Sequence, residues 1–156
     1  MTRGELLQSL SGTPDRVSEL ARGLSPSQLA RRPREGEWSM GEILNHLLVG
    51  ERDVIFPRLK RMLLEEAPVF PSSASSRTGF AAVPETRDVV ADLLAFRRVR
   101  GETLAFLEGL KDRDWRRTGT TPTRGTLTIE AYVRYVAEHD AEHLLQLETA
   151  RAVVER

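Results

Sequence analysis

The sequence contains no cysteine among its 156 residues. This absence excludes disulfides, thiolate zinc sites and cysteine nucleophiles. Any tight site for a transition metal must therefore be built from histidine and carboxylate side chains. Histidine is also scarce, with three in the whole chain.

Long hydrophobic runs are missing as well. No stretch approaches the roughly 20 apolar residues that a helix needs to cross a bilayer. The first twelve residues, MTRGELLQSLSG, lack the apolar centre of a signal peptide. We therefore expect a cytoplasmic protein with no membrane-inserted segment.

Neither sign of charge is in excess, since 23 Lys and Arg residues balance 23 Asp and Glu residues. A neutral chain is a poor candidate for binding nucleic acid or for coating an anionic membrane. The length predicts one domain covering residues 1–156, and the 40% of hydrophobic residues is enough for a core.

Helical periodicity is what the sequence does contain. Apolar residues recur at three- and four-residue steps in four long segments. These segments cover about 4–22, 39–66, from 84–86 to 110, and 128–154. A short helical turn with a capping box is expected at Ser25–Gln28, and a second capping box, Ser39 with Glu42, opens the second long helix.

Two prolines interrupt this pattern. Thr13 and Pro14 together predict a kink or a fresh helix start inside the first segment. Pro57 predicts a kink or a local irregularity in the second segment.

A stretch without periodicity, residues 68–83, separates the second and third helices and is rich in Pro, Ser and Ala. Extended, it spans roughly 50 Å, which exceeds the roughly 42 Å of a 28-residue helix. The second and third helices can therefore run parallel. We find no convincing strand, since the extended piece at 123–130 is too brief for a sheet. The sequence predicts a single all-α four-helix bundle with a long loop between helices two and three.

The three histidines form the candidate site. His139 and His143 are four residues apart, so their rings point from one side of a helix toward a common point. His46 sits between apolar residues, including Ile43 and Leu47, on another helix. Three rings converging in a core would repel one another if charged. A divalent cation bound by neutral imidazoles resolves this conflict and keeps open coordination positions, as catalytic rather than structural sites do.

A metalloprotease is the rival interpretation of residues 139–143, HDAEH. Asp140 occupies the position of the general-base Glu in H-E-x-x-H and is one methylene too short. No histidine follows His143 to serve as a downstream third ligand. We therefore reject the protease.

Two further residues are candidates for catalysis. Tyr132 lies about two turns from the histidine pair on the same face, where its hydroxyl can reach a substrate or simply pack in the core. Asp53 lies about two turns beyond His46, where it is a proton acceptor or a solvated charge. Both alternatives stay open at this level.

Other polar and aromatic side chains have plainer interpretations. Trp38 is expected to pack against the start of the second helix, with a place at the mouth of a pocket as the alternative. The arginine-rich stretch at 97–100, RRVR, is expected to be a solvated face. Arg124 is the first arginine to test for binding a substrate carboxylate.

The segments that carry the histidines resemble those of the DinB-like, or YfiT-like, family of four-helix metalloproteins. Residues 24–51 are similar to the entry into that family's second helix, with Trp-Ser ahead of the first histidine. Residues 128–148 resemble its last helix, with the H-x-x-x-H pair and a following Gln. The resemblance covers nearly the whole chain, although the first helix and the middle match only in pattern.

This resemblance implies an up-down-down-up bundle, often dimeric, that binds zinc or nickel through His46, His139 and His143. Relatives with assigned activity transfer low-molecular-weight thiols such as bacillithiol, or use mycothiol for isomerisation. The leading hypothesis is thus a metal-dependent transferase that joins a small thiol to an electrophile, with Tyr132 and Asp53 as helpers. The alternatives are a non-enzymatic, stress-related metal-binding homodimer and a metal-dependent hydrolase.

Overall fold

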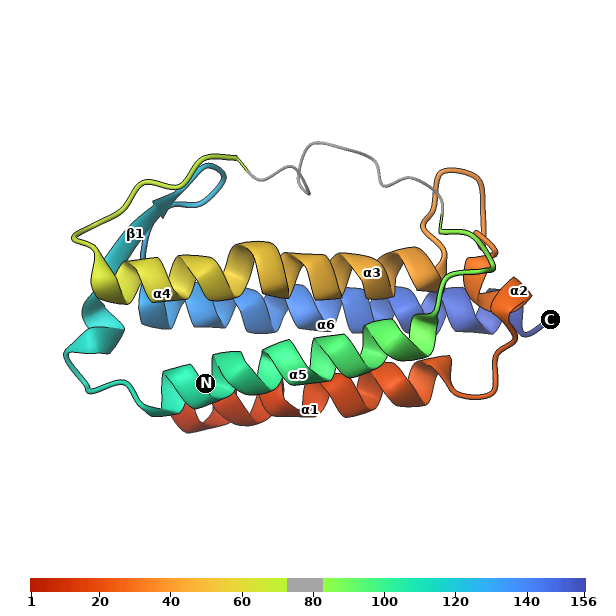
Figure 1. Ribbon diagram of the computed structural model, residues 1–156, viewed down its shortest axis with the longest axis horizontal. Helices are drawn as coiled ribbons and strands as arrows, with labels where there is room; N and C mark the ends of the chain where they lie inside the picture. Colours follow the sequence, from red (N-terminus) through yellow and green to blue (C-terminus); the bar gives the residue numbers. More distant parts are fainter. Residues whose placement is uncertain (73–82) are drawn as a thin grey trace.

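Four long helices pack side by side in the computed structural model, which describes residues 1–72 and 83–156 (Figure 1). The elements are α1 (Arg3–Ala21), α2 (Pro26–Ala30), α3 (Met40–Gly50), the π-helix η1 (Glu51–Ile55), α4 (Phe56–Leu64), α5 (Val89–Glu108), the 3₁₀-helix η3 (Asp114–Arg116), β1 (Thr118–Thr121), β2 (Gly125–Thr128) and α6 (Ile129–Val154). α3, η1 and α4 follow one another without a break and form one long helical rod.

The direction of the helices confirms the up-down-down-up topology. α5 begins at the opposite end of the bundle from the end of α4, so the α3–α4 rod and α5 run parallel, while α1 and α6 run the other way (Figure 1). Most of the predicted loop at 68–83 lies outside the described residues.

The fresh helix start predicted at Thr13 and Pro14 is wrong, because α1 is continuous through Pro14. Proline has no N–H to donate to the carbonyl four residues earlier, which belongs to Leu10. In this bundle the Leu10 carbonyl instead accepts a hydrogen bond from Arg100 Nη1 at 2.9 Å. The helix survives because a neighbouring helix supplies the missing donor.

Pro57 does mark an irregularity, as predicted. The five residues before α4 form a π-helix, in which the Phe56 N–H donates to the Glu51 carbonyl five residues back. Twelve residues of regular α-helix would turn Arg58 about 120° away from His46, at 100° per residue. The wider π-turn removes part of that rotation, and both side chains line one pocket.

Two other predictions need correction. α5 begins at Val89, three to five residues later than the predicted start at 84–86, because the Asp88 carboxylate accepts from the Ala91 N–H and caps the helix. β1 and β2 pair in an antiparallel hairpin that the sequence analysis missed. Its signals are the β-branched threonines and Gly125, whose φ of 70° suits a tight turn.

The bundle interior is divided by a polar layer. One apolar cluster fills the half that contains the end of α1 and the start of α3, and a second fills the half around α4 and the start of α6. Between them each long helix contributes one buried polar side chain: Thr13, Glu51, Arg100 and Asp140. Since RRVR was expected to be solvated, the burial of Arg100, 1% exposed, corrects that prediction.

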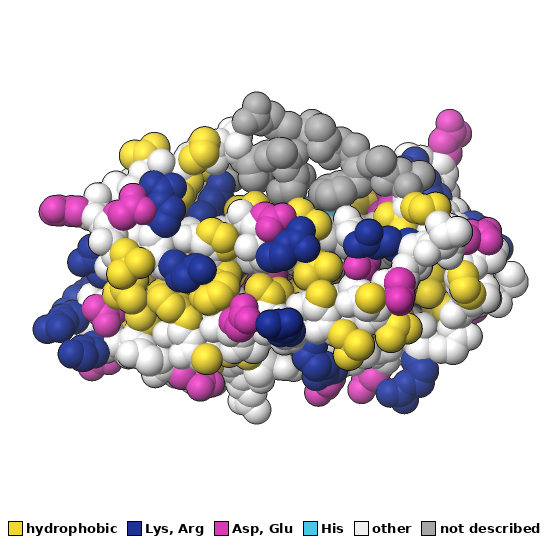
Figure 2. Space-filling view, in the orientation of Figure 1, with side chains coloured by type: hydrophobic (Ala, Val, Ile, Leu, Met, Phe, Trp, Pro, Cys, Tyr) yellow, Lys and Arg dark blue, Asp and Glu magenta, His cyan; other side chains and the backbone are white. Residues whose placement is uncertain are grey.

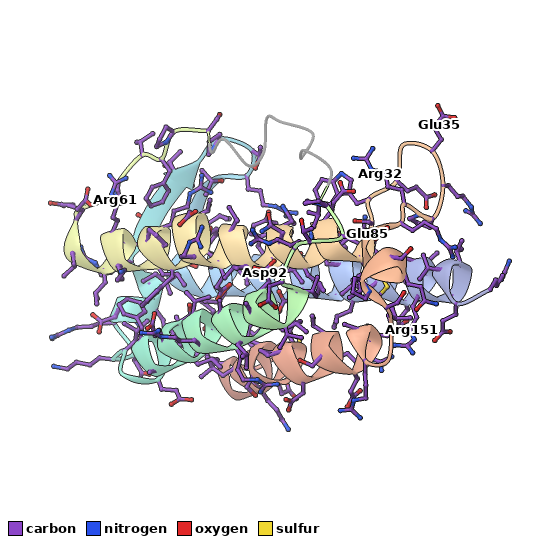
Figure 3. All side chains as sticks on the ribbon, turned by 45° about the vertical axis from the view of Figure 1, so that its right-hand side comes forward. Arg32, Glu35, Arg61, Glu85, Asp92 and Arg151 are labelled. Atoms are coloured by element: carbon purple, nitrogen blue, oxygen red, sulfur yellow. The ribbon has the colours of Figure 1, made fainter. Side chains whose placement is uncertain are left out.

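Ion pairs and caps secure the helix ends. Arg151 on α6 donates to the Leu20 and Arg22 carbonyls at the end of α1, at 2.6 and 2.9 Å (Figure 3). Arg32 holds the buried Glu42 carboxylate at the start of α3 (Figure 3). The capping boxes predicted at Ser25 and Ser39 are both present.

The face of the molecule seen in Figure 2 shows no dominance of one charge. Figure 2 shows basic and acidic side chains interspersed on the visible face, with hydrophobic side chains between them. Such a mixture lacks the basic stripe that tracks a phosphate backbone. Among the described residues, no helix has the length and apolarity required to cross a membrane.

The two apolar clusters predict that the fold persists without a metal. Treatment with EDTA should lower the melting temperature, since a ligand of the native state is lost. It should leave the helical far-UV circular dichroism at 25 °C unchanged, because each cluster buries side chains from all four long helices. Loss of the helical signal on chelation would contradict this prediction, and would assign the histidines a structural role.

Candidate metal centre

Three helical turns bring all three histidines to one point. His46 comes from α3, and His139 and His143 come from successive turns of α6. His139 Nε2 lies 3.4 Å from His46 Nε2 and 3.1 Å from His143 Nε2. One ligand atom from each ring lies within 4.8 Å of the other two. The convergence predicted from the sequence is therefore present.

These distances fit a metal ion. Zinc–imidazole bonds of about 2.0–2.1 Å in tetrahedral geometry place two ligand nitrogens about 3.3 Å apart. The Nε2 atoms face one another, so a hydrogen on one of them points at another ring nitrogen. A cation that accepts all three lone pairs satisfies these part-buried nitrogens together.

The protonation state also favours a cation. Burial and the neighbouring histidines lower the pKa of His46 to about 4. Burial, followed by the effect of His143, lowers the pKa of His139 to about 4. Both rings are neutral at pH 7, as metal ligands must be.

The orientation of His143 is set by Gln146, one turn along α6. The ring nitrogen Nδ1 lies 2.9 Å from the Gln146 side-chain oxygen. A hydrogen on Nδ1 donates to that oxygen and leaves Nε2 as the metal-facing lone pair. An amide thus does what a carboxylate commonly does beside a metal-bound histidine.

Trp38 lies against the ligands as well as the helix start. Its ring stacks parallel to that of His143, with centroids 6.4 Å apart, and meets that of His46 edge-on at 5.0 Å. This contact goes beyond the packing role expected from the sequence. The indole covers one side of the three-histidine cluster with apolar surface.

The other side of the cluster opens onto a pocket of about 190 Å³. Its lining combines the α3–α4 rod, α6 and the hairpin turn: His46, Gly50, Val54, Ile55, Arg58, Pro122, Thr123, Tyr132, Tyr135 and His139. The pocket is smaller than the roughly 300–1,000 Å³ typical of sites for drug-sized ligands. It suits a small molecule placed next to the ligand nitrogens.

Of the two predicted catalytic residues, the structure brings Tyr132 to the pocket but not Asp53. Tyr132 is 1% exposed and lines the pocket wall. Burial raises the pKa of its hydroxyl to about 12, against an opposing effect of Arg58. Asp53 is absent from the lining, and its exposed carboxylate pairs with Arg52 at 2.9 Å.

The main feature that the sequence analysis missed is the buried ion-pair network beside the site. Arg100 binds Glu51 through Nε at 2.8 Å and Asp140 through Nη1 at 2.7 Å. Asp140 also accepts from the Thr13 hydroxyl at 2.7 Å. Because Asp140 follows His139 directly, the network fixes the rotation of α6 at the ligand. A signal existed, since these charges stand at positions where the helices repeat apolar residues.

Comparisons with known proteins agree with this architecture. The family model described as DinB superfamily matches residues 9–147. The chain is 24% identical over 148 residues to "Uncharacterized protein YuaE" of Bacillus subtilis, covering 86% of this chain and 90% of that protein. It is also 24% identical over 148 residues to "Putative metal-dependent hydrolase GK0616" of Geobacillus kaustophilus, covering 94% and 83% of the two chains.

A solved structure shares the fold. YfiT from Bacillus subtilis, described as having an unusual four-helix bundle topology, superposes with a TM-score of 0.86 at 21% identity. The match covers 96% of this chain and 87% of YfiT.

Proposed function

This chain belongs to the DinB superfamily, and we propose that it is a metal-dependent enzyme acting on a small molecule in the pocket beside His46 and His139. The observation that carries the proposal is the pocket itself. A site that only stores or binds a metal needs no cavity next to its ligands. Here two of the three histidines form part of the cavity wall.

A divalent ion held by the three histidines would lower the pKa of a small nucleophile that it binds. The name of the relative from Geobacillus kaustophilus, a putative metal-dependent hydrolase, supports a bound metal. Zinc and nickel both accept imidazole ligands. The protein's own part is to hold the three rings neutral, orient His143 through Gln146, and exclude water on the Trp38 side.

A low-molecular-weight thiol is the nucleophile that we favour. Hydrolysis is commonly assisted by a carboxylate that takes the proton of water, and no Asp or Glu is among the described residues that line the pocket. A thiol, with a pKa near 8.5, loses its proton more easily than water. The sulfur then bonds to the electrophilic carbon, the leaving group departs with the bonding electron pair, and the thiol proton passes to solvent.

Tyr132 would assist as a hydrogen-bond donor. Its raised pKa keeps the hydroxyl protonated at pH 7. From the pocket wall it can donate to an oxygen of the electrophile, and so stabilise negative charge that develops during attack. Hydrolysis is the second candidate, favoured by the name of the relative from Geobacillus kaustophilus.

The test uses protein substituted with Co²⁺. Adding small thiols, bacillithiol among them, is expected to produce a sulfur-to-cobalt charge-transfer band at a pH well below the free thiol's pKa of about 8.5. Tyr132→Phe should retain the band, and should slow any transfer reaction by tenfold or more. If protein shown to contain cobalt gives no band with any of these thiols, hydrolysis becomes the better candidate.

A further inference from the structure

Arg58 is the cationic side chain of the pocket next to the histidines. It comes from the first turns of α4, is half-buried, and lines the cavity wall together with Tyr132. Its Nη2 donates to the Pro71 carbonyl at 3.2 Å, and its guanidinium lies 5.2 Å from the centre of the Phe70 ring. The guanidinium is thus held in place by a neutral carbonyl and an aromatic ring.

No acidic side chain of the described residues neutralises Arg58. The nearby carboxylates Asp53 and Glu65 form ion pairs with other arginines. Asp53 pairs with Arg52, and Glu65 pairs with Arg61. Just over half of the described arginines form such pairs, including Arg3, Arg16, Arg32, Arg87, Arg97, Arg100 and Arg151. A half-buried guanidinium without a carboxylate partner provides a positive charge on the wall of this pocket.

The rest of the wall suits a small organic anion. Tyr132 and Tyr135 offer aromatic surface and hydroxyl groups. A side chain at Gly50 would meet no atom within 4 Å, so the glycine keeps this part of the pocket wide. Outside the lining, the Arg124 guanidinium stacks on the Tyr135 ring at 4.0 Å and adds a second positive charge beside the wall.

We propose that Arg58 is the anion-binding residue of this pocket, and that the substrate is a small organic acid whose carboxylate it binds. The planar guanidinium fork matches a carboxylate through two parallel hydrogen bonds. The rest of the molecule then lies between Arg58 and the histidines. The identity of the reacting group at the histidines rests on the proposed function, but the carboxylate selectivity does not.

The test compares a carboxylate probe with its neutral isostere on the zinc-loaded protein. NMR titration should give a Kd for 3-phenylpropionate at least tenfold lower than that for 3-phenylpropanamide. Arg58→Gln should reduce this preference to less than threefold, while leaving the Kd of the amide unchanged. Arg58→Lys should keep part of the preference, since it retains the charge but not the fork.

Arg61→Gln is the matched control, because Arg61 lies on the same helix but is paired with Glu65. It should retain the full preference for the carboxylate. Metal-free protein should also retain it, which separates binding by Arg58 from direct ligation of zinc. An equal preference in wild type and Arg58→Gln, or no detectable binding of 3-phenylpropionate at millimolar concentration, overturns the proposal.

The outcome is independent of the thiol experiment. Arg58-dependent carboxylate selectivity without a thiol band supports the anion site and rejects the thiol as nucleophile. A thiol band without carboxylate selectivity supports the thiol as nucleophile and rejects the anion site at Arg58.

Discussion

Replacing His139 with alanine is expected to abolish metal retention during purification. His139 lies at the centre of the cluster, since its Nε2 is within 3.4 Å of both other Nε2 atoms. Loss of an outer-shell partner alone costs about 10–100-fold in affinity, so loss of this ligand should weaken binding by more than about 100-fold. Metal content by mass spectrometry and competition with a chelator measure the effect.

Graded variants make this experiment specific. Gln146→Leu removes only the partner of His143 Nδ1 and should weaken binding by about tenfold. Glu138→Ala, at an exposed position beside His139, should bind metal as the wild type does. One full equivalent of metal in a variant lacking His46, His139 and His143 together would refute the assignment.

Replacing Arg100 with leucine is expected to cause a large loss of unfolding free energy, because Arg100 is the shared cation of two buried carboxylates. The change leaves the Glu51 and Asp140 carboxylates, 0% and 3% exposed, without their cation. It also removes the donor to the Leu10 carbonyl that Pro14 cannot satisfy. Breaking a buried pair in this way costs about 3–5 kcal/mol of unfolding free energy. Urea denaturation monitored by circular dichroism measures the loss.

Two comparisons separate this network from ordinary surface charge. Arg97→Leu, on the same helix, breaks an exposed pair with Asp15 and should cost less than about 1 kcal/mol. Adding Glu51→Gln and Asp140→Asn to the Arg100→Leu variant should restore part of the stability, because neither amide is a buried charge. A loss below about 1 kcal/mol for Arg100→Leu would contradict the expectation that Glu51 and Asp140 need this cation.

The sequence by itself determined the four long helices, the capping boxes at Ser25 and Ser39, and the three histidines of the candidate metal centre. Apolar spacing of three and four residues is a local property, and so is the capping box at Ser39. The spacing of His139 and His143 places two rings on one helix face whatever surrounds them. The approach of His46 followed because its apolar neighbours required that helix face to be buried.

Only the tertiary structure decided how polar groups inside the bundle are satisfied. Pro14 looked like a break because its helix cannot supply a partner for the Leu10 carbonyl, whereas Arg100 of α5 can. Arg100, Glu51 and Asp140 stand at core-facing positions of their helices, but the burial of each charge depends on its meeting the others from three different helices. Arg58 lines the same pocket as His46 because the π-turn shifts the helix register. The partner of the Leu10 carbonyl, the burial of the three charges and the place of Arg58 all depend on contacts between residues distant in sequence. Local periodicity does not encode such contacts.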